Sequence, residues 1–331
     1  MSRLLVAVLG ALFVPLSAVA QNPSQRHIQF HYKFSVRNLP QGKPARIWFP
    51  QAKSDDFQTV AVQNIKSDLP VKQTREGEYG NSMYYAETLS VAKPEYTFDV
   101  TYDVVRREHK VNLDKPEPAR LKRASLDRFL QPDKLVPISG LPANIASKQV
   151  VGAQTALEKA HALYQYTLAN MKYDKTGTGW GRGDTLYACD AKHGNCSDFH
   201  SLFISMARSQ GIPARFEIGF PLPAATQEGE IPGYHCWAEF YDPQHGWVPV
   251  DISEAWKDPS KRDYFFGAHD VNRVQFSMGR DITLSPKQAG DPLNYFVYPY
   301  VEVAGKKWEN VATEFSFADL PATKGVVATG R

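Results

Sequence analysis

The segment that most constrains the fold of this chain is centred on Cys196. Asn195 is a good helix cap, and Asp198 stands at the third helical position, where a carboxylate favours a helix start. Gly211 is a typical helix end, and Pro213 keeps the helix from resuming. The apolar residues in between recur on one helical face: Phe199, Leu202, Phe203, Met206 and Ala207. The pattern predicts one amphipathic helix that begins at Cys196.

After this helix the chain alternates with the period of two that is typical of β-strands. The alternation covers residues 215–220, 234–241 and 247–251, and the turn at 241–246 joins the last two into a hairpin. In the middle segment one face is apolar, made by Tyr234, Cys236, Ala238 and Phe240. A helix followed by an antiparallel sheet is therefore predicted for this part of the chain.

The hairpin can bring His235 and Asp251 together. If Tyr241 pairs with His245, then His235 lies directly opposite Asp251 on the neighbouring strand. A slip of one residue would place the two side chains on opposite faces of the sheet. The favourable register is our prediction.

These residues are of the types that nucleophilic catalysis needs. Cys196 would stand at the positive end of a helix, which stabilises the thiolate, the nucleophilic form of cysteine. An imidazole such as that of His235 can hold the thiolate and protonate a leaving group, and a carboxylate such as Asp251 can orient the imidazole. Taken singly, a buried structural cysteine and a structural histidine are the alternatives.

The N-terminal part of the chain predicts a different architecture. Residues 28–36, 45–49 and 96–104 have strand patterns, separated by turn-rich segments. We expect an antiparallel β-sandwich over residues 21–112 and a linker over 113–150. The chain is then α+β: the sandwich is followed by a helix-on-sheet domain with a C-terminal extension over 151–303, and by a C-terminal strand and tail over 304–331.

Residues 1–20 have the pattern of a secretory signal peptide: Arg3, an apolar stretch and an Ala-Val-Ala cleavage site that ends at Ala20. We expect an exported protein, periplasmic or secreted, with no stable membrane insertion. The formal net charge is only +3, with acidic and basic residues interspersed, so there is no electrostatic reason to expect a nucleic-acid partner. The oligomeric state is left open.

The chain has three cysteines, and an odd count in an oxidising compartment leaves one thiol unpaired. A disulfide between Cys189 and Cys236 would leave Cys196 free, although Cys236 could equally be packed on its apolar strand face. A zinc site built from the cysteines and nearby histidines matches no known spacing and would consume the nucleophile. We therefore expect no metal and no cofactor.

Four motifs together resemble the transglutaminase-like superfamily, whose core is papain-like. They are Gly-Asn-Cys-Ser-Asp-Phe-His-Ser-Leu-Phe at 194–203, Gly-Ile-Pro-Ala-Arg at 211–215, Tyr-His-Cys-Trp-Ala-Glu at 234–239 and Gly-Trp-Val-Pro-Val-Asp at 246–251. The resemblance covers about residues 150–255, and the preceding sandwich is similar to that of bacterial exported members. It implies a catalytic triad of Cys196 as nucleophile, His235 as base and acid, and Asp251 as orienter.

The resemblance also implies an oxyanion hole made by the backbone N–H of the nucleophile and an upstream side chain. The papain-type glutamine would fall at position 190, which is Asp190, so Trp180 and Asn195 are the remaining candidates. The expected activity is hydrolysis of an amide bond in a peptide or protein substrate, or acyl transfer, through a thioester. The alternative is a non-catalytic module that binds a protein or cell-wall ligand.

Overall fold

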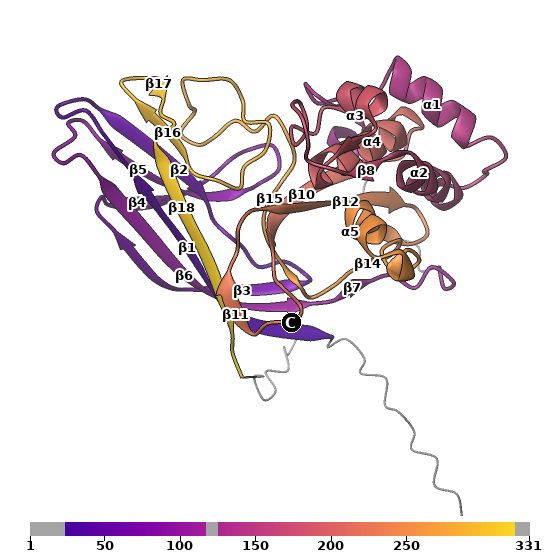
Figure 1. The fold of residues 1–331 in the computed structure, drawn as a ribbon, viewed down its shortest axis with the longest axis horizontal. Helices are drawn as coiled ribbons and strands as arrows, with labels where there is room; N and C mark the ends of the chain where they lie inside the picture. Colours follow the sequence, from indigo (N-terminus) through magenta and orange to yellow (C-terminus); the bar gives the residue numbers. More distant parts are fainter. Residues whose placement is uncertain (1–23, 117–124, 322–331) are drawn as a thin grey trace, which may run out of the picture.

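The computed structural model describes residues 24–116 and 125–321. The expected signal peptide at 1–20 and most of the expected tail after residue 321 lie outside the described residues. In the described parts the chain is α+β, with a sandwich of two sheets beside a layer of helices on a third sheet (Figure 1).

The sandwich consists of two five-stranded antiparallel sheets. One has the order β11-β18-β1-β6-β3, with bounds Glu228–Glu230, Val311–Asp319, Gln25–Val36, Tyr96–Arg107 and Gln58–Ser67. The other has the order β17-β16-β2-β5-β4, with bounds Lys306–Lys307, Tyr300–Val303, Ala45–Pro50, Ser82–Thr88 and Val71–Arg75. Aromatic side chains pack between them, as where Phe34 of β1 lies 5.0 Å from Phe49 of β2, centroid to centroid.

The alternating pattern of the N-terminal segments forms strands as predicted. Along β6 every second side chain is buried, because one face of the sheet covers the sandwich core. β1 and β6 pair over their whole length, with Ile28 opposite Val104. The predicted strands at 28–36, 45–49 and 96–104 correspond to β1, β2 and β6.

The sandwich is not built from residues 21–112 alone. β18 pairs with β1, with Phe30 opposite Phe317, and β16 pairs with β2. The returning C-terminal strands, drawn in yellow in Figure 1, thus complete both sheets. Local periodicity shows that a strand exists but not which distant strand it pairs with, so the sequence did not reveal this closure.

The second part of the fold is an antiparallel sheet of order β13-β12-β10-β15, covered by helices. These strands are Gly246–Val250, His235–Asp242, Ala214–Pro221 and Arg273–Met278. The helices are α1 Leu141–Gln149, α2 Ala156–Asn170, α3 Thr185–Ala191, α4 Cys196–Ser209 and α5 Ile252–Lys257, with short 3₁₀ helices η2 Asp127–Leu130 and η3 Pro259–Lys261. Two small sheets pair β8 Lys172–Tyr173 with β9 His193–Gly194, and β7 His109–Lys110 with β14 Ala268–His269. The expected linker at 113–150 therefore contains η2 and a helix, α1.

Helix α4 is buried on all sides rather than along one stripe. The other α-helices and strands β10 and β12 all contact it. Its polar residues have partners inside the protein: Ser205 donates to the carbonyl of Pro137, and Arg208 pairs with Asp133 at 2.6 Å. These two polar side chains of α4 thus find hydrogen-bond partners in segments that precede the helix in the sequence.

The sandwich packs against the other part through aromatic contacts. Phe220 of β10 and Phe276 of β15 lie 5.3 and 5.4 Å from the ring of Phe30. Strand β12 is buried on both faces, including the face that carries His235 and Glu239. Within the described residues, no helix is both long and apolar enough to span a membrane.

Candidate active site

Cys196 is the first residue of α4, as the cap pattern predicted. Asn195 caps the helix, because its Oδ1 accepts the Ser197 N–H at 2.9 Å, and Asp198 accepts the Asn195 N–H at 2.9 Å. The Cys196 side chain is only 2% exposed. The start of the helix is therefore fixed, and the thiol lies in the interior.

The glycine-rich loop before α3, residues 176–183, also holds the first turn of α4 in place. The N–H groups of Gly181 and Gly183 donate to the two carboxylate oxygens of Asp198, at 2.7 and 3.0 Å. Gly183 has φ +59°, and a Cβ there would lie 2.5 Å from both Arg280 Nη1 and Ser201 Oγ. Glycine is needed because the loop lies against helix α4.

His235 and Asp251 meet, but not through the register expected. Tyr241 pairs with Trp247 and not with His245, so the hairpin is shifted by two residues. A shift of two keeps every side chain on its face. Asp251 follows β13 as the N-cap of α5, and its Oδ2 lies 2.7 Å from His235 Nε2.

Asp251 is held by more than the histidine. Arg273 Nη1, from β15, donates to Asp251 Oδ2 at 2.9 Å, and the Glu254 N–H donates to Oδ1 at 3.2 Å. Burial raises the pKa of Asp251, but the charges of His235 and Arg273 outweigh this and hold it well below its usual value. No sequence pattern pointed to Arg273, since it lies in the extension beyond the motifs.

Cys196 and His235 each shift the pKa of the other. Burial raises the pKa of the Cys196 thiol, but hydrogen bonds with Cys236 and His235 and the charge of His235 together lower it well below its usual value. Burial lowers the pKa of His235, yet the Asp251 carboxylate and Cys196 raise it to about 10. Because Nε2 of His235 is bonded to Asp251, Nδ1 is the ring nitrogen that can hydrogen-bond with the sulfur of Cys196. The site favours a thiolate–imidazolium pair.

His200 bridges the two halves of the site. Its Nε2 accepts the Ile252 N–H at 3.0 Å, which fixes the proton on Nδ1, and Nδ1–H donates to the Cys196 carbonyl at 2.8 Å. Burial lowers the pKa of His200, so this neutral form is maintained. His200 therefore joins the first turn of α4 to the residue that follows Asp251.

The disulfide between Cys189 and Cys236 is not formed, since all three cysteines are free. Cys236 points from β12 to the start of α4, with its Sγ 3.6 Å from Ser197 Oγ and 3.8 Å from His200 Nδ1. Cys189 lies on α3, where burial raises the pKa of its thiol to about 11. The pairing was inferred from an odd count alone, and the fold places Cys236 beside Cys196 instead.

The two side chains expected as oxyanion donors have other partners. The indole N–H of Trp180 donates to the Gly177 carbonyl at 3.2 Å. The amide of Asn195 donates to the Tyr234 hydroxyl at 3.0 Å, and this hydroxyl also contacts Ser197 Oγ at 2.9 Å. Tyr234, next to His235 in the sequence, thus holds the cap residue, a role that the sequence analysis missed.

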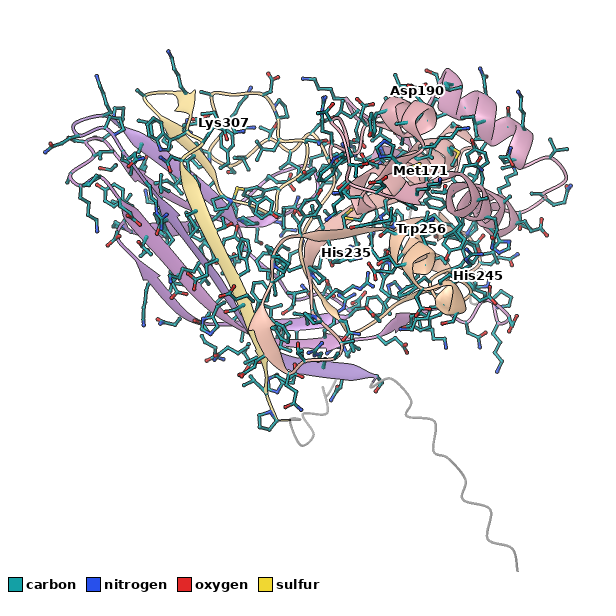
Figure 2. All side chains as sticks on the ribbon, in the orientation of Figure 1. Met171, Asp190, His235, His245, Trp256 and Lys307 are labelled. Carbon is teal, nitrogen blue, oxygen red and sulfur yellow. The ribbon has the colours of Figure 1, made fainter. Side chains whose placement is uncertain are left out.

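A cleft of about 440 Å³ opens beside His235. One wall is apolar and lies at the end of β10 and the loop after it; the other is charged and comes from α5 and its continuation. Representative wall residues are Pro221, Leu222 and Ile231 on the first and Glu254, Lys257 and Lys261 on the second. Figure 2 shows His235 in the interior, between the sandwich and the helices.

Residues 143–252 match the family model described as the transglutaminase-like superfamily. This part of the chain is a transglutaminase-like domain. It contains the segments of Cys196, His235 and Asp251, and it ends one residue after the last of them. The resemblance of the four motifs is thereby confirmed at the level of the family.

Relatives extend the similarity beyond this domain. A protein of Haemophilus influenzae, itself uncharacterised, is 27% identical over 344 residues, which is 91% of this chain and 93% of that protein. The uncharacterised protein YebA of Bacillus subtilis is 23% identical over 256 residues, 67% of this chain but only 34% of YebA. The similarity to the Haemophilus protein thus extends over the strands of the sandwich as well as the transglutaminase-like domain of this chain.

A solved structure shares the overall architecture. A Cytophaga hutchinsonii protein, named as a candidate cysteine protease, superposes with a TM-score of 0.62 at 15% identity, covering 92% of this chain and 93% of that one. At this identity the likeness concerns the fold, which is confirmed as a sandwich joined to a transglutaminase-like core.

Proposed function

We propose that this protein is an exported thiol enzyme that hydrolyses or transfers the acyl group of an amide bond in a peptide or protein. The observation that carries the proposal is the arrangement of Cys196, His235 and Asp251. A buried carboxylate lies 2.7 Å from the imidazole, and the pKa of the thiol is lowered despite burial. A purely structural cysteine needs neither feature.

The geometry supports a two-step reaction. The Cys196 thiolate adds to the acyl carbon, and the imidazolium of His235 then gives its proton to the leaving amine nitrogen as the C–N bond breaks. The thioester that remains is attacked by water or a second amine, whose proton returns to His235 as the thiolate leaves. Asp251 stays ionised and keeps the imidazole in place throughout.

The oxyanion would be stabilised at the start of α4. The first N–H groups of a helix have no intrahelical acceptor, and that of Cys196 adjoins the sulfur. The Asn195 cap and Asp198 hold this turn in place. The side-chain donor expected from Trp180 or Asn195 stays a proposal, and it requires either side chain to change its present partner.

The cleft beside His235 suits an extended peptide, because an apolar wall faces a charged one. Export to the periplasm or the cell exterior is inferred from residues 1–20. A non-catalytic binding module is the second candidate, and the observation that favours it is the 2% exposure of the Cys196 side chain. Turnover requires a substrate to reach this sulfur, whereas binding in the cleft does not.

A substrate screen distinguishes the two. The mature protein is incubated with denatured proteins and peptide mixtures, with and without a primary amine, and products are identified by mass spectrometry. We expect new termini without amine, or amine-containing acyl products with it, and neither for Cys196→Ala. Cys189→Ala is the matched control and should keep full activity. Turnover that survives Cys196→Ala would refute the proposal, and binding without any turnover would support the module.

A further inference from the structure

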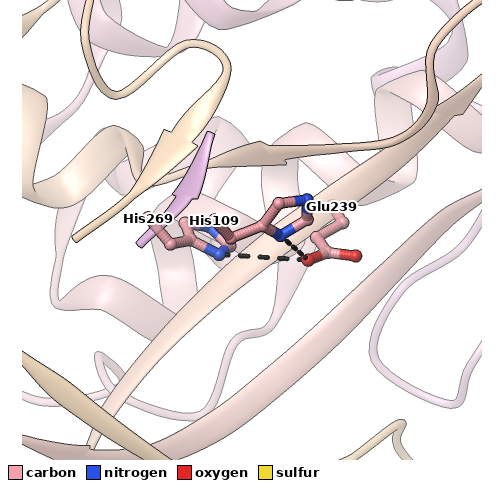
Figure 3. A group of neighbouring side chains, drawn as sticks. All are labelled: His109, Glu239 and His269. Carbon is pink, nitrogen blue, oxygen red and sulfur yellow. Dashed lines mark ion pairs between the residues drawn. The ribbon is translucent and has the colours of Figure 1, made fainter. Parts of the chain in front are cut away.

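A second cluster of ionisable side chains lies outside the active site, where β12 meets the small sheet of β7 and β14. It consists of His109, Glu239 and His269 (Figure 3). The two histidines are directly opposite each other in the β7–β14 pair, and Glu239 comes from β12. All three side chains are buried, and their potential ligand atoms lie within 4.8 Å of one another.

His269 has the form of a metal-ligating histidine. Its Nε2 lies 3.2 Å from the carbonyl of Val250, which can only accept, so Nε2 carries the proton and Nδ1 has a free lone pair. Among the residues that the structure describes, this Nδ1 has no hydrogen-bond partner, although it is fully buried.

The distances suit a small tetrahedral ion. Metal–nitrogen and metal–oxygen bonds of about 2.0 to 2.1 Å place two zinc ligands about 3.3 Å apart. Glu239 Oε1 lies 3.1 Å from His109 Nδ1 and 3.9 Å from His269 Nδ1, which brackets this value. The remaining pair, His109 Nδ1 and His269 Nδ1, lies within 4.8 Å, so the two imidazoles would move towards a bound ion.

The Glu239 carboxylate is also held in place by an arginine. Arg215, directly opposite on β10, pairs with Oε2 at 2.5 Å and also contacts Glu217 at 3.1 Å. Arg215 thus orients the carboxylate from behind and leaves Oε1 facing the imidazoles.

We propose that His109, Glu239 and His269 bind a divalent zinc ion through Nδ1, Oε1 and Nδ1. Two imidazoles and one carboxylate are a ligand set that occurs in zinc sites, whereas calcium and magnesium prefer oxygen ligands alone. Three protein ligands leave one tetrahedral position for water. The positive charge of Arg273 weakens the affinity for a cation, so we expect binding weaker than at four-ligand structural sites.

The ion would brace the frame of the active site. Glu239 lies on the same strand and the same face as His235, four residues along. His269 contacts the carbonyl of Val250, the residue before Asp251. A zinc ion here would tie β7 and β14 to the strands that position the triad, and it would not touch the reacting atoms.

Zinc binding is measured on the mature chain carrying Cys196→Ala, which removes the reactive thiol. After treatment with a chelator, zinc is titrated in competition with a fluorescent indicator. We expect one zinc ion per chain, and a loss of affinity of at least about 100-fold for His269→Asn and for Glu239→Gln. His161→Asn, on an exposed face of α2, is the matched control and should bind as before.

Zinc could instead bind in the active site, where His235, Asp251 and Glu254 also lie close enough together to hold an ion. Zinc that is lost in Glu254→Gln and kept in folded His269→Asn would overturn the proposal, as would the absence of stoichiometric zinc. X-ray absorption of the zinc-loaded protein gives a test that needs no site variant. Two imidazoles per zinc support the site, and one or none contradicts it.

Discussion

Replacing His200 with leucine tests whether this residue joins the two halves of the site. His200 is fully buried, and its ring satisfies the Cys196 carbonyl at 2.8 Å and the Ile252 N–H at 3.0 Å. Leucine has a similar volume but makes neither hydrogen bond. Each orphaned buried backbone group costs about 1 to 3 kcal/mol, so His200→Leu should lower the free energy of unfolding by about 2 to 6 kcal/mol.

Equilibrium unfolding in urea measures this loss as a lower midpoint at unchanged slope. His161→Leu, on the exposed face of α2, is the control and should change the free energy by less than about 0.5 kcal/mol. His200→Asn should recover part of the loss, since its amide can replace Nδ1–H as the donor. A loss below about 0.5 kcal/mol for His200→Leu would refute the bridging role.

Three further predictions concern charges inside the protein. Asp133→Ala leaves Arg208 buried without its carboxylate and should cost about 3 to 5 kcal/mol in urea unfolding. Burial raises the pKa of Glu217 from 4.5 to about 7, so the fold favours the neutral form and this stability is lost as pH rises through 7. Glu217→Gln should thus be more stable than wild type by up to about 3 kcal/mol at pH 8, and little different at pH 5. Cys236→Ala removes a hydrogen bond that lowers the pKa of Cys196, so Cys196 alkylation should need a higher pH.

For each of these three predictions, one outcome would contradict the reasoning. Equal urea midpoints for Asp133→Ala and wild type would show that the pair with Arg208 contributes nothing. A Glu217→Gln protein that is destabilised equally at both pH values would contradict the raised pKa. For Cys236→Ala, an alkylation profile that coincides with that of wild type would exclude Cys236 as a stabiliser of the thiolate.

The sequence points to Cys196, His235 and Asp251 because each lies beside a strong local signal. Cys196 follows a good cap, His235 lies on an alternating strand, and Asp251 ends a hairpin. The hairpin register was wrong because the turn lies one residue further along the chain than expected: Asp242 pairs with Gly246, and Asp242 Oδ2 accepts the Gln244 N–H at 3.0 Å. The two-residue error was harmless because strand periodicity is two.

Long-range contacts could not be predicted in the same way. Arg273 comes from β15, and its ion pair with Asp251 depends on how the strands are arranged in the folded sheet. The pairing of β18 with β1 joins segments nearly 300 residues apart, and the polar face of β12 is buried where Glu239 meets His109 of β7. None of these features leaves a periodic or capping pattern, since each depends on which surfaces meet.

The most direct test of the account is the pH dependence of Cys196 alkylation by iodoacetamide, followed by site-resolved mass spectrometry. The absolute rate depends on access to a buried sulfur, but the midpoint of the profile reports the pKa of the thiol. We predict a midpoint well below 8.5 for Cys196, and a shift above it in His235→Ala, where burial remains and the imidazolium is gone. Cys189, whose thiol pKa burial raises to about 11, is the internal control and should react only in alkaline solution. A Cys196 profile with an ordinary midpoint, the same with and without His235, would contradict the thiolate–imidazolium pair.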